Sequence, residues 1–146
     1  NYFLLFLFTV CEGYVVSILC GLTDPEIVGM AAIMTLAIVV CLTIYSITTD
    51  SDFTVLNSLV WIVSTIMLLF GIFVLFTDNP VIHIFYCCCG VFSFSLYLVY
   101  DTQLIIGKRN NQLGIDDYIV AALMLYVDIV GLFINLLDLL SRIMKK

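Results

Sequence analysis

Long hydrophobic runs alternate with short polar segments along the whole chain. A helix needs about 20 mainly apolar residues to cross the hydrocarbon core of a bilayer, and each run reaches that length. The runs cover about residues 2–22, 27–48, 55–76, 81–106 and 115–141. The pattern predicts an all-α, polytopic transmembrane helix bundle with five spans, which form a single transmembrane domain over residues 1–146.

The polar segments carry residues that end one helix and begin the next. Residues 23–25 and 77–80 combine N-cap side chains with a proline for the first turn. Residues 107–114 form the one sizeable loop, after which Asp116 or Asp117 is expected to cap the last helix. Short links make neighbouring helices antiparallel. A transmembrane barrel is excluded, because the runs are too long and do not alternate with period two.

Composition narrows the class of protein further. Hydrophobic residues make up 64% of the chain and charged residues 11%, whereas soluble domains have about 45–50% and ~25%. These values exclude a water-soluble globule, a disordered chain and a disulfide-stapled scaffold. The net charge of -6, without a basic patch, excludes a nucleic-acid partner and leaves the lipid bilayer. The first run begins at residue 2 without an initiator Met, so we expect a fragment or a processed form.

Small and polar side chains recur at helical spacing within four of the runs. These positions follow one face of each helix, and such residues usually mark tight packing between membrane helices. The stripes are Ala121, Asp128, Gly131, Asn135, Asp138 and Arg142; Gly90, Ser93 or Phe94, Tyr97, Asp101 and Leu104; Thr9, Glu12 or Gly13, Ser17 and Gly21; and Asn57, Trp61, Ser64 or Thr65, Leu68 and Gly71. We therefore predict that these faces point into the bundle.

Three consecutive cysteines, Cys87, Cys88 and Cys89, lie in the fourth run. Adjacent helical residues point about 100° apart, so the three thiols cannot converge on one metal ion. We interpret them as small, polarizable packing residues. His83 lies near the start of the same run, where a structural role is expected.

Four acidic residues lie inside the apolar runs: Glu12, Asp101, Asp128 and Asp138. A charge at the bilayer centre costs about 2.5–3.5 kcal/mol on insertion scales, so each acid is a functional candidate that needs a partner. Asp138 has Arg142 four residues later, which predicts an ion pair. Glu12 has no base on its own helix and is a candidate for an ion pathway.

Asp101 and Asp128 lie on consecutive antiparallel runs joined by the loop at 107–114. At about 1.5 Å per residue, Asp101 lies about 9 Å and Asp128 about 16 Å from that loop, which helix tilt could largely reconcile. Two carboxylates in hydrocarbon cannot both ionise cheaply, and they titrate as a unit. The pair must share a proton, hold a cation such as a weakly bound calcium ion, or meet a base from elsewhere.

Two long segments carry a resemblance to a known family. Residues 95–107 read SLYLVYDTQLIIG, and residues 117–129 read DYIVAALMLYVDI and are followed by Leu132-Phe133. Both resemble signature motifs of the Bax inhibitor / Lifeguard family. Thr35, Leu42-Thr43 and Asp52-Phe53-Thr54 also fit its middle segment.

The resemblance implies a seven-helix fold, of which this chain holds the C-terminal five, with the last helix enclosed by the others. It implies a non-enzymatic, pH-sensitive calcium leak of an internal membrane (endoplasmic reticulum, Golgi or mitochondrial inner membrane) that suppresses cell death. The family's paired-aspartate pH sensor falls on Asp101 and Asp128, and no cofactor is implied beyond a calcium ion. Membrane protein partners are compatible with it. Asp138 and the three cysteines depart from the family pattern.

Two alternatives stay open. The chain could be a structural or regulatory subunit of a larger complex, without transport. It could also be an intramembrane aspartyl protease, in which two aspartates share a proton and activate water. Tyr100-Asp101 is similar to the first catalytic motif of presenilin-type enzymes. However, Asp128 follows Tyr126-Val127 instead of Gly-x-Gly, and no Pro-Ala-Leu motif follows.

Overall fold

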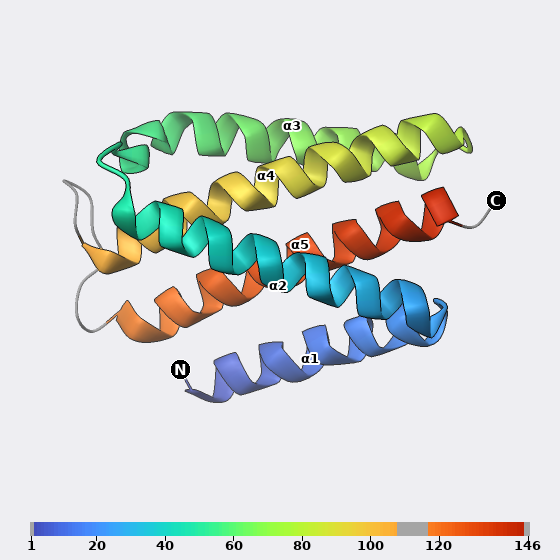
Figure 1. The fold of residues 1–146 in the computed structure, drawn as a ribbon, viewed down its shortest axis with the longest axis horizontal. Coiled ribbons are helices and arrows are strands. Elements are labelled where there is room, and N and C mark those ends of the chain that lie inside the picture. The colour runs from blue at the N-terminus through green and yellow to red at the C-terminus, as the bar shows by residue number, and fades with distance from the viewer. Residues whose placement is uncertain (1, 108–116, 145–146) are drawn as a thin grey trace.

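The computed structural model describes residues 2–107 and 117–144 (Figure 1). Within them the chain forms five α-helices and one short 3-10 turn, and all five helices are long and apolar enough to cross a membrane. The prediction of an all-α bundle with five spans is confirmed. The elements are α1 (Tyr2–Gly21), α2 (Pro25–Thr48), η1 (Phe53–Leu56), α3 (Asn57–Leu75), α4 (Pro80–Ile106) and α5 (Tyr118–Met144).

The helix ends follow the polar segments with local differences. Asn79 caps α4, because its Oδ1 accepts a hydrogen bond of 2.9 Å from the Val81 amide. Asp24 stands at the N-cap of α2, but its side chain makes no capping bond, so this part of the expectation is wrong. Gly107 ends α4 with a φ of 67°, which glycine adopts without strain. Residues 108–116, with most of the predicted loop and Asp116, lie outside the described residues.

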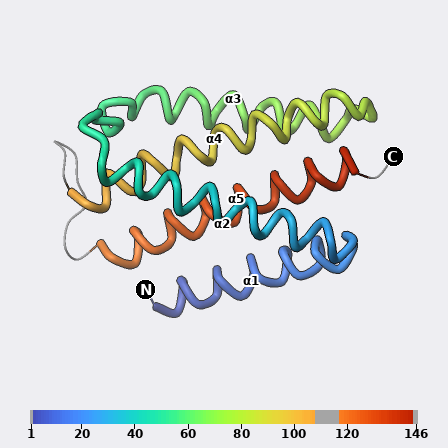
Figure 2. The backbone as a smooth tube through the Cα atoms, in the orientation of Figure 1, coloured from blue at the N-terminus to red at the C-terminus, as the bar shows by residue number. Residues whose placement is uncertain are grey.

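The core lies between α2, α4 and α5. α4 and α5 lie side by side over much of their length, and α2 packs against both (Figures 1 and 2). α3 packs on α4, whereas α1 makes only a small contact with α5. A buried cluster joins α2 to α5 and consists of Ile27, Ala31, Leu132, Leu136 and Leu137. α5 is thus contacted by α4, α2 and α1 in the part of the chain that the structure describes.

The stripe on α1 does not form the predicted packing face. No residue of α1 is buried. A Cβ added at Gly13 or Gly21 would meet no atom within 4 Å, and Thr9 and Ser17 are exposed. The spacing was helical, but only a facing helix could have turned this stripe into a buried surface.

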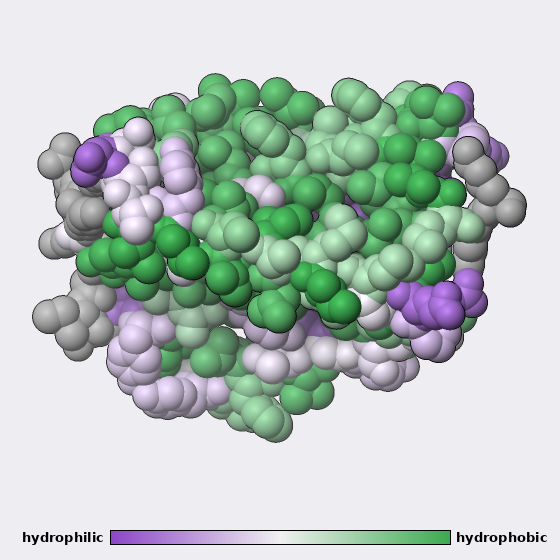
Figure 3. Space-filling model, in the orientation of Figure 1, coloured by the Kyte–Doolittle hydropathy of each residue, from purple (hydrophilic) through white to green (hydrophobic). Residues whose placement is uncertain are grey.

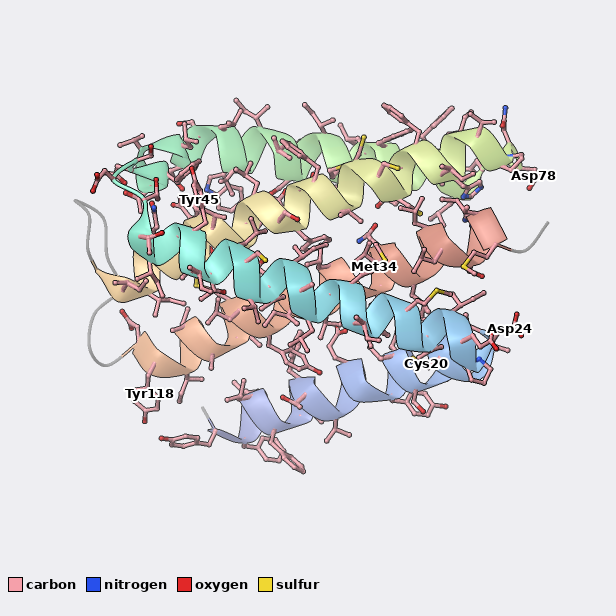
Figure 4. The ribbon with its side chains drawn as sticks, in the orientation of Figure 1. Cys20, Asp24, Met34, Tyr45, Asp78 and Tyr118 are labelled. Atoms are coloured by element: carbon pink, nitrogen blue, oxygen red, sulfur yellow. The ribbon has the colours of Figure 1, made fainter. Side chains whose placement is uncertain are left out.

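The outer surface is apolar along the length of the helices. Hydrophobic residues cover most of the face in Figure 3, and hydrophilic residues gather toward the two ends of the long axis. Figure 4 marks one end by Asp24 and Asp78 and the other by Tyr45 and Tyr118. We call these the Asp78 end and the Tyr45 end. An apolar belt between two polar ends is the surface that a bilayer requires.

Candidate functional site

The facing stripes of α4 and α5 meet in an antiparallel register. The Cys87 thiol donates a 3.1 Å hydrogen bond to Asp138 Oδ2. One turn further along α4, a Cβ at Gly90 would collide with the Asn135 side chain. The next turn brings the Phe94 ring against Gly131 in the same way. The two glycines therefore allow the helices to approach closely along this seam.

Asp101 and Asp128 lie on the same seam, toward the Tyr45 end. A side-chain hydrogen bond joins their carboxyl groups, and the two residues are only 9% and 4% exposed. A hydrogen bond between two carboxyl groups needs a proton on one of them, because an ionised carboxylate only accepts. Such a contact is favourable when the pair holds one proton and unfavourable when both carboxyls are ionised. Among the described residues, Asp128 Oδ2 has no hydrogen-bond partner.

The depth of the pair follows from the helix ends. Asp101 lies five residues before Ile106 and Asp128 ten residues after Tyr118, so they lie about 8 Å and about 15 Å from these ends. The two values differ by roughly 7 Å, a little more than one helical turn. Both carboxyls lie within hydrocarbon depth.

Gln103 anchors the end of α4 that carries Asp101. Its Oε1 accepts a 2.8 Å bond from the Phe53 amide, and its Nε2 donates to the Ser51 and Ser46 carbonyls at 3.0 and 3.3 Å. The Ser46 hydroxyl in turn donates to the Val99 carbonyl at 3.0 Å. Sequence reasoning missed Gln103. The signal was a long polar side chain inside an apolar run, which must find partners when it is buried.

Tyr100 adds a second anchor about one turn before Gln103 on α4. Its hydroxyl donates a 3.0 Å hydrogen bond to Asn57 Oδ1 at the start of α3. Together with Gln103, this bond ties the segment around Asp101 to the α2–α3 connection. The position of one carboxyl of the pair is thus set by α2, η1 and α3 as well as by α5.

Glu12 does not join the pair. It lies half-buried on α1, and α1 contacts α5 only slightly. Within residues 2–107 and 117–144, Glu12 makes no hydrogen bond or ion pair. Glu12 therefore has no hydrogen bond or ion pair that joins it to Asp101 or Asp128, and its place on an ion pathway stays a prediction.

Asp138 and Arg142 form an ion pair near the Asp78 end. Arg142 Nε lies 3.0 Å from Asp138 Oδ1, and both side chains are partly exposed. The three adjacent cysteines diverge: Cys87 is buried, Cys89 is half-buried and Cys88 is exposed, and all three are free thiols. Across the described residues, no three His, Cys, Asp or Glu side chains converge as a metal site would require.

The aspartate pair can hold a proton or, in its place, a weakly bound cation. Calcium takes six to eight oxygen ligands, and two carboxylates supply only part of that set, with water needed for the rest. A cation at this position would displace the shared proton, since the proton already neutralises one carboxylate. Proton and cation therefore compete for the same oxygens.

Known proteins are similar to this chain over nearly its whole length. A family model described as "Inhibitor of apoptosis-promoting Bax1" matches residues 1–145. "Protein lifeguard 3" of Homo sapiens is 33% identical over 145 residues, which is 97% of this chain and 47% of that protein. "Protein lifeguard 4" of Mus musculus is 32% identical and "Golgi anti-apoptotic protein" of vaccinia virus 30% identical, each over 146 residues, 100% of this chain and 60% of the relative.

The chain spans between 47% and 60% of the length of these curated relatives. The matched region contains all five helices and both members of the aspartate pair. This agrees with the resemblance carried by residues 95–107 and 117–129. The chain belongs to the Bax inhibitor / Lifeguard family of membrane proteins.

Proposed function

We propose that this chain is the membrane-embedded part of a pH-sensitive cation leak protein, with calcium as the transported ion and Asp101–Asp128 as the sensor. The observation that carries the proposal is the hydrogen-bonded pair of buried carboxyls between α4 and α5. Buried acids in a membrane bundle are costly and therefore rare, and they usually mark a functional site.

The pair couples charge to helix packing. With one proton the two carboxyls attract each other through a hydrogen bond, and without it two like charges face each other in a medium of low dielectric constant. Loss of the proton therefore weakens the contact between α4 and α5 or draws in a cation. Either response connects pH to the ion pathway.

Four other titratable groups on the elements around the pair, Tyr100, Asp52, Glu12 and Tyr45, form no hydrogen bond with either carboxyl in the described residues. Tyr100 interacts electrostatically with Asp101, and its hydroxyl is bonded to Asn57. From the packed elements, Asp52 accepts from the Thr54 amide and hydroxyl, and Glu12 and Tyr45 form no hydrogen bond with either carboxyl. The pH response is therefore assigned to the pair itself.

The names of its relatives support a proposal about the setting of the whole protein. One of them is named a Golgi anti-apoptotic protein, and the family is described as an inhibitor of Bax1. We infer that the complete protein lies in an internal membrane and suppresses cell death there, with other membrane proteins as partners. A calcium leak that lowers the ion store of that membrane is a mechanism consistent with this role.

The test is calcium flux through the purified protein in lipid vesicles, measured from about pH 5 to 8. Asp101→Asn and Asp128→Asn keep the size of each side chain but remove one titrating group. We expect the flux to lose most of its pH dependence in both variants. Asp50→Asn, which changes an exposed acid outside the pair, is the matched control and should keep the wild-type profile.

Two outcomes would contradict the proposal. A wild-type pH profile in both Asn variants would remove the sensor role from the pair. No flux from the wild-type protein at any pH would contradict the leak and would favour the structural or regulatory subunit.

A further inference from the structure

The part of α4 that carries Asp101 is enclosed by protein on all sides. Residues 98–103 are all buried, and the described residues contain no other run of six consecutive buried positions. A helical segment that is buried all round meets neighbours in every direction. Asp101 lies inside this segment, so the position of its backbone is fixed by the elements that cover the segment.

The hydrogen bonds of this segment to other elements lead to the α2–α3 connection and to the two helix ends beside it. At the end of α2, the Ser46 hydroxyl donates to the Val99 carbonyl at 3.0 Å. At the start of α3, Asn57 accepts a 3.0 Å hydrogen bond from the Tyr100 hydroxyl. Between them, Gln103 exchanges hydrogen bonds with backbone groups of the connection itself.

The connection is a fixed frame in its own right. Thr54 is fully buried, and its amide donates a 3.0 Å hydrogen bond to Asp52 Oδ1, which also accepts from its hydroxyl. The Phe53 ring packs edge-to-face on Tyr45, with centroids 6.0 Å apart. η1 packs against both α3 and α4. A frame held in this way is able to set the position of the helix that is bonded to it.

The network lies between the pair and the membrane surface at the Tyr45 end. Gln103 is three residues before Ile106, the last residue of α4, which places it about 4.5 Å from that helix end. A charge-assisted bond between two oxygens is only about 2.5–2.7 Å long, and functional groups must be held to within about 0.5 Å. A small shift of this end of α4 would therefore break the contact between the two carboxyls.

Titratable groups on all the packed elements bear on the charge of the pair, and α3 carries none. Those toward the Tyr45 end and the middle of the bundle are Tyr2, Cys11, Glu12, Tyr14, Cys41, Tyr45, Asp50, Asp52, Tyr97, Tyr100, Asp117, Tyr118 and Tyr126. Of these, Tyr100 is the group that interacts electrostatically with Asp101, and each carboxyl of the pair otherwise responds to its partner.

We propose that Gln103 and the hydrogen bond between Tyr100 and Asn57 are positioning elements of the sensor, which hold Asp101 in contact with Asp128. The α2–α3 connection, a segment at the membrane surface, is then part of the sensor although it supplies neither carboxyl. The proposal rests on the proposed function and adds the residues that set its pH response.

The test uses variants that leave both carboxyls in place. Asn57→Ala and Tyr100→Phe each remove the same hydrogen bond, whereas Asn57→Asp keeps an oxygen that can accept it. The matched control is Asn79→Ala, which removes a 2.9 Å capping bond from the other end of the same helix. Asn79 lies 22 residues before Asp101, about 33 Å away along α4.

Two readouts are recorded on the protein in lipid vesicles. Infrared difference spectra between two pH values show the C=O stretch of protonated carboxyls, and the band of the pair is assigned by its loss in Asp101→Asn/Asp128→Asn. Calcium flux is measured across the same pH range. The infrared band reports the contact between the carboxyls whether or not the protein conducts ions.

We expect the band to move to higher frequency in Asn57→Ala and Tyr100→Phe, because a weaker hydrogen bond leaves a stronger C=O bond. The midpoint of the flux profile should shift by about half a pH unit, roughly threefold in proton affinity. The double variant should match either single variant, since all three lose one and the same bond. Asn57→Asp and Asn79→Ala should resemble wild type, and Gln103→Leu should shift both readouts at least as far as Asn57→Ala.

An unchanged band in Asn57→Ala, Tyr100→Phe and Gln103→Leu would overturn the positioning role. An equal shift in Asn79→Ala would also overturn it, because general loosening of α4 would then explain the effect. A shifted band in a protein without calcium flux would support the positioning role and contradict the leak. Failure of this inference is therefore distinguishable from failure of the proposed function.

Discussion

Outside the aspartate pair, Gln103 is the buried polar side chain with hydrogen bonds to several distant backbone groups. It is buried and exchanges hydrogen bonds with three backbone groups on two other segments, at Ser46, Ser51 and Phe53. Backbone groups in these connections have no helical partner to replace it. One amide side chain thus holds α4 to the α2–α3 connection, two residues from Asp101.

Replacing Gln103 by Leu should destabilise the protein. Leucine has a size similar to that of glutamine but cannot form hydrogen bonds, so the Phe53 amide and two carbonyls lose their partner. Loss of hydrogen bonds to buried groups lowers the free energy of unfolding by roughly 1–3 kcal/mol. Unfolding in mixed micelles of increasing denaturing detergent would measure it. Thr65→Val, which removes only an exposed intrahelical bond to the Trp61 carbonyl, should stay within about 0.5 kcal/mol of wild type. An equal effect of both variants would contradict the anchoring role.

At the scale of the elements, the contact between α4 and α5 depends on two glycines. Gly90 and Gly131 lie where the partner helix presents Asn135 and Phe94, and neither position has room for a Cβ atom. Close approach of these backbones is what brings the carboxyls of the pair into hydrogen-bond contact. The seam therefore couples helix packing to the candidate site.

Gly131→Ala should push the Phe94 ring out of place and separate the two helices. Overpacking of this kind costs about 1–3 kcal/mol, which the same detergent unfolding would detect. The double variant Gly131→Ala/Phe94→Leu should recover part of the loss, because the smaller side chain leaves room for the new methyl group. Gly13→Ala on α1 has open space and should gain up to about 1 kcal/mol from helix propensity. A Gly131→Ala protein as stable as Gly13→Ala would contradict the close seam.

At the scale of the whole molecule, the apolar belt fixes how the bundle sits in the bilayer. Large apolar side chains cover the outer faces of all five helices, and polar residues gather at the two ends (Figure 3). Transfer of this surface from lipid to water would be strongly unfavourable. The single tryptophan, Trp61, is exposed on this surface near the start of α3.

Brominated lipids should therefore quench the fluorescence of Trp61. Lipids with bromine near the headgroups should quench it more strongly than lipids with bromine near the bilayer centre. Trp61 lies four residues after Asn57, about 6 Å inside the Tyr45 end of α3. Moving the fluorophore with Trp61→Phe/Ile66→Trp places it about 7.5 Å deeper, and the preference should shift to the deeper bromine. Strong quenching of Trp61 by aqueous iodide in place of lipid bromine would contradict this position.

The sequence by itself determined the five helices, because hydrophobic length and cap residues act locally, within one run and its flanking segment. It also predicted the faces of α4 and α5 that meet, since a short link makes them antiparallel and the stripes repeat at 3.6 residues. The pairing of Asp101 with Asp128 followed from these two facts, whereas their role stays a prediction.

Features that depend on contacts with a third helix or segment were decided only by the tertiary structure. The stripe on α1 has the same spacing as that on α4, but no helix covers it, so Gly13 faces open space and Glu12 has no partner among the described residues. The contacts of Gln103 join segments about fifty residues apart. Periodicity assigns a residue to a face of its own helix, but only packing decides whether that face meets protein, water or lipid.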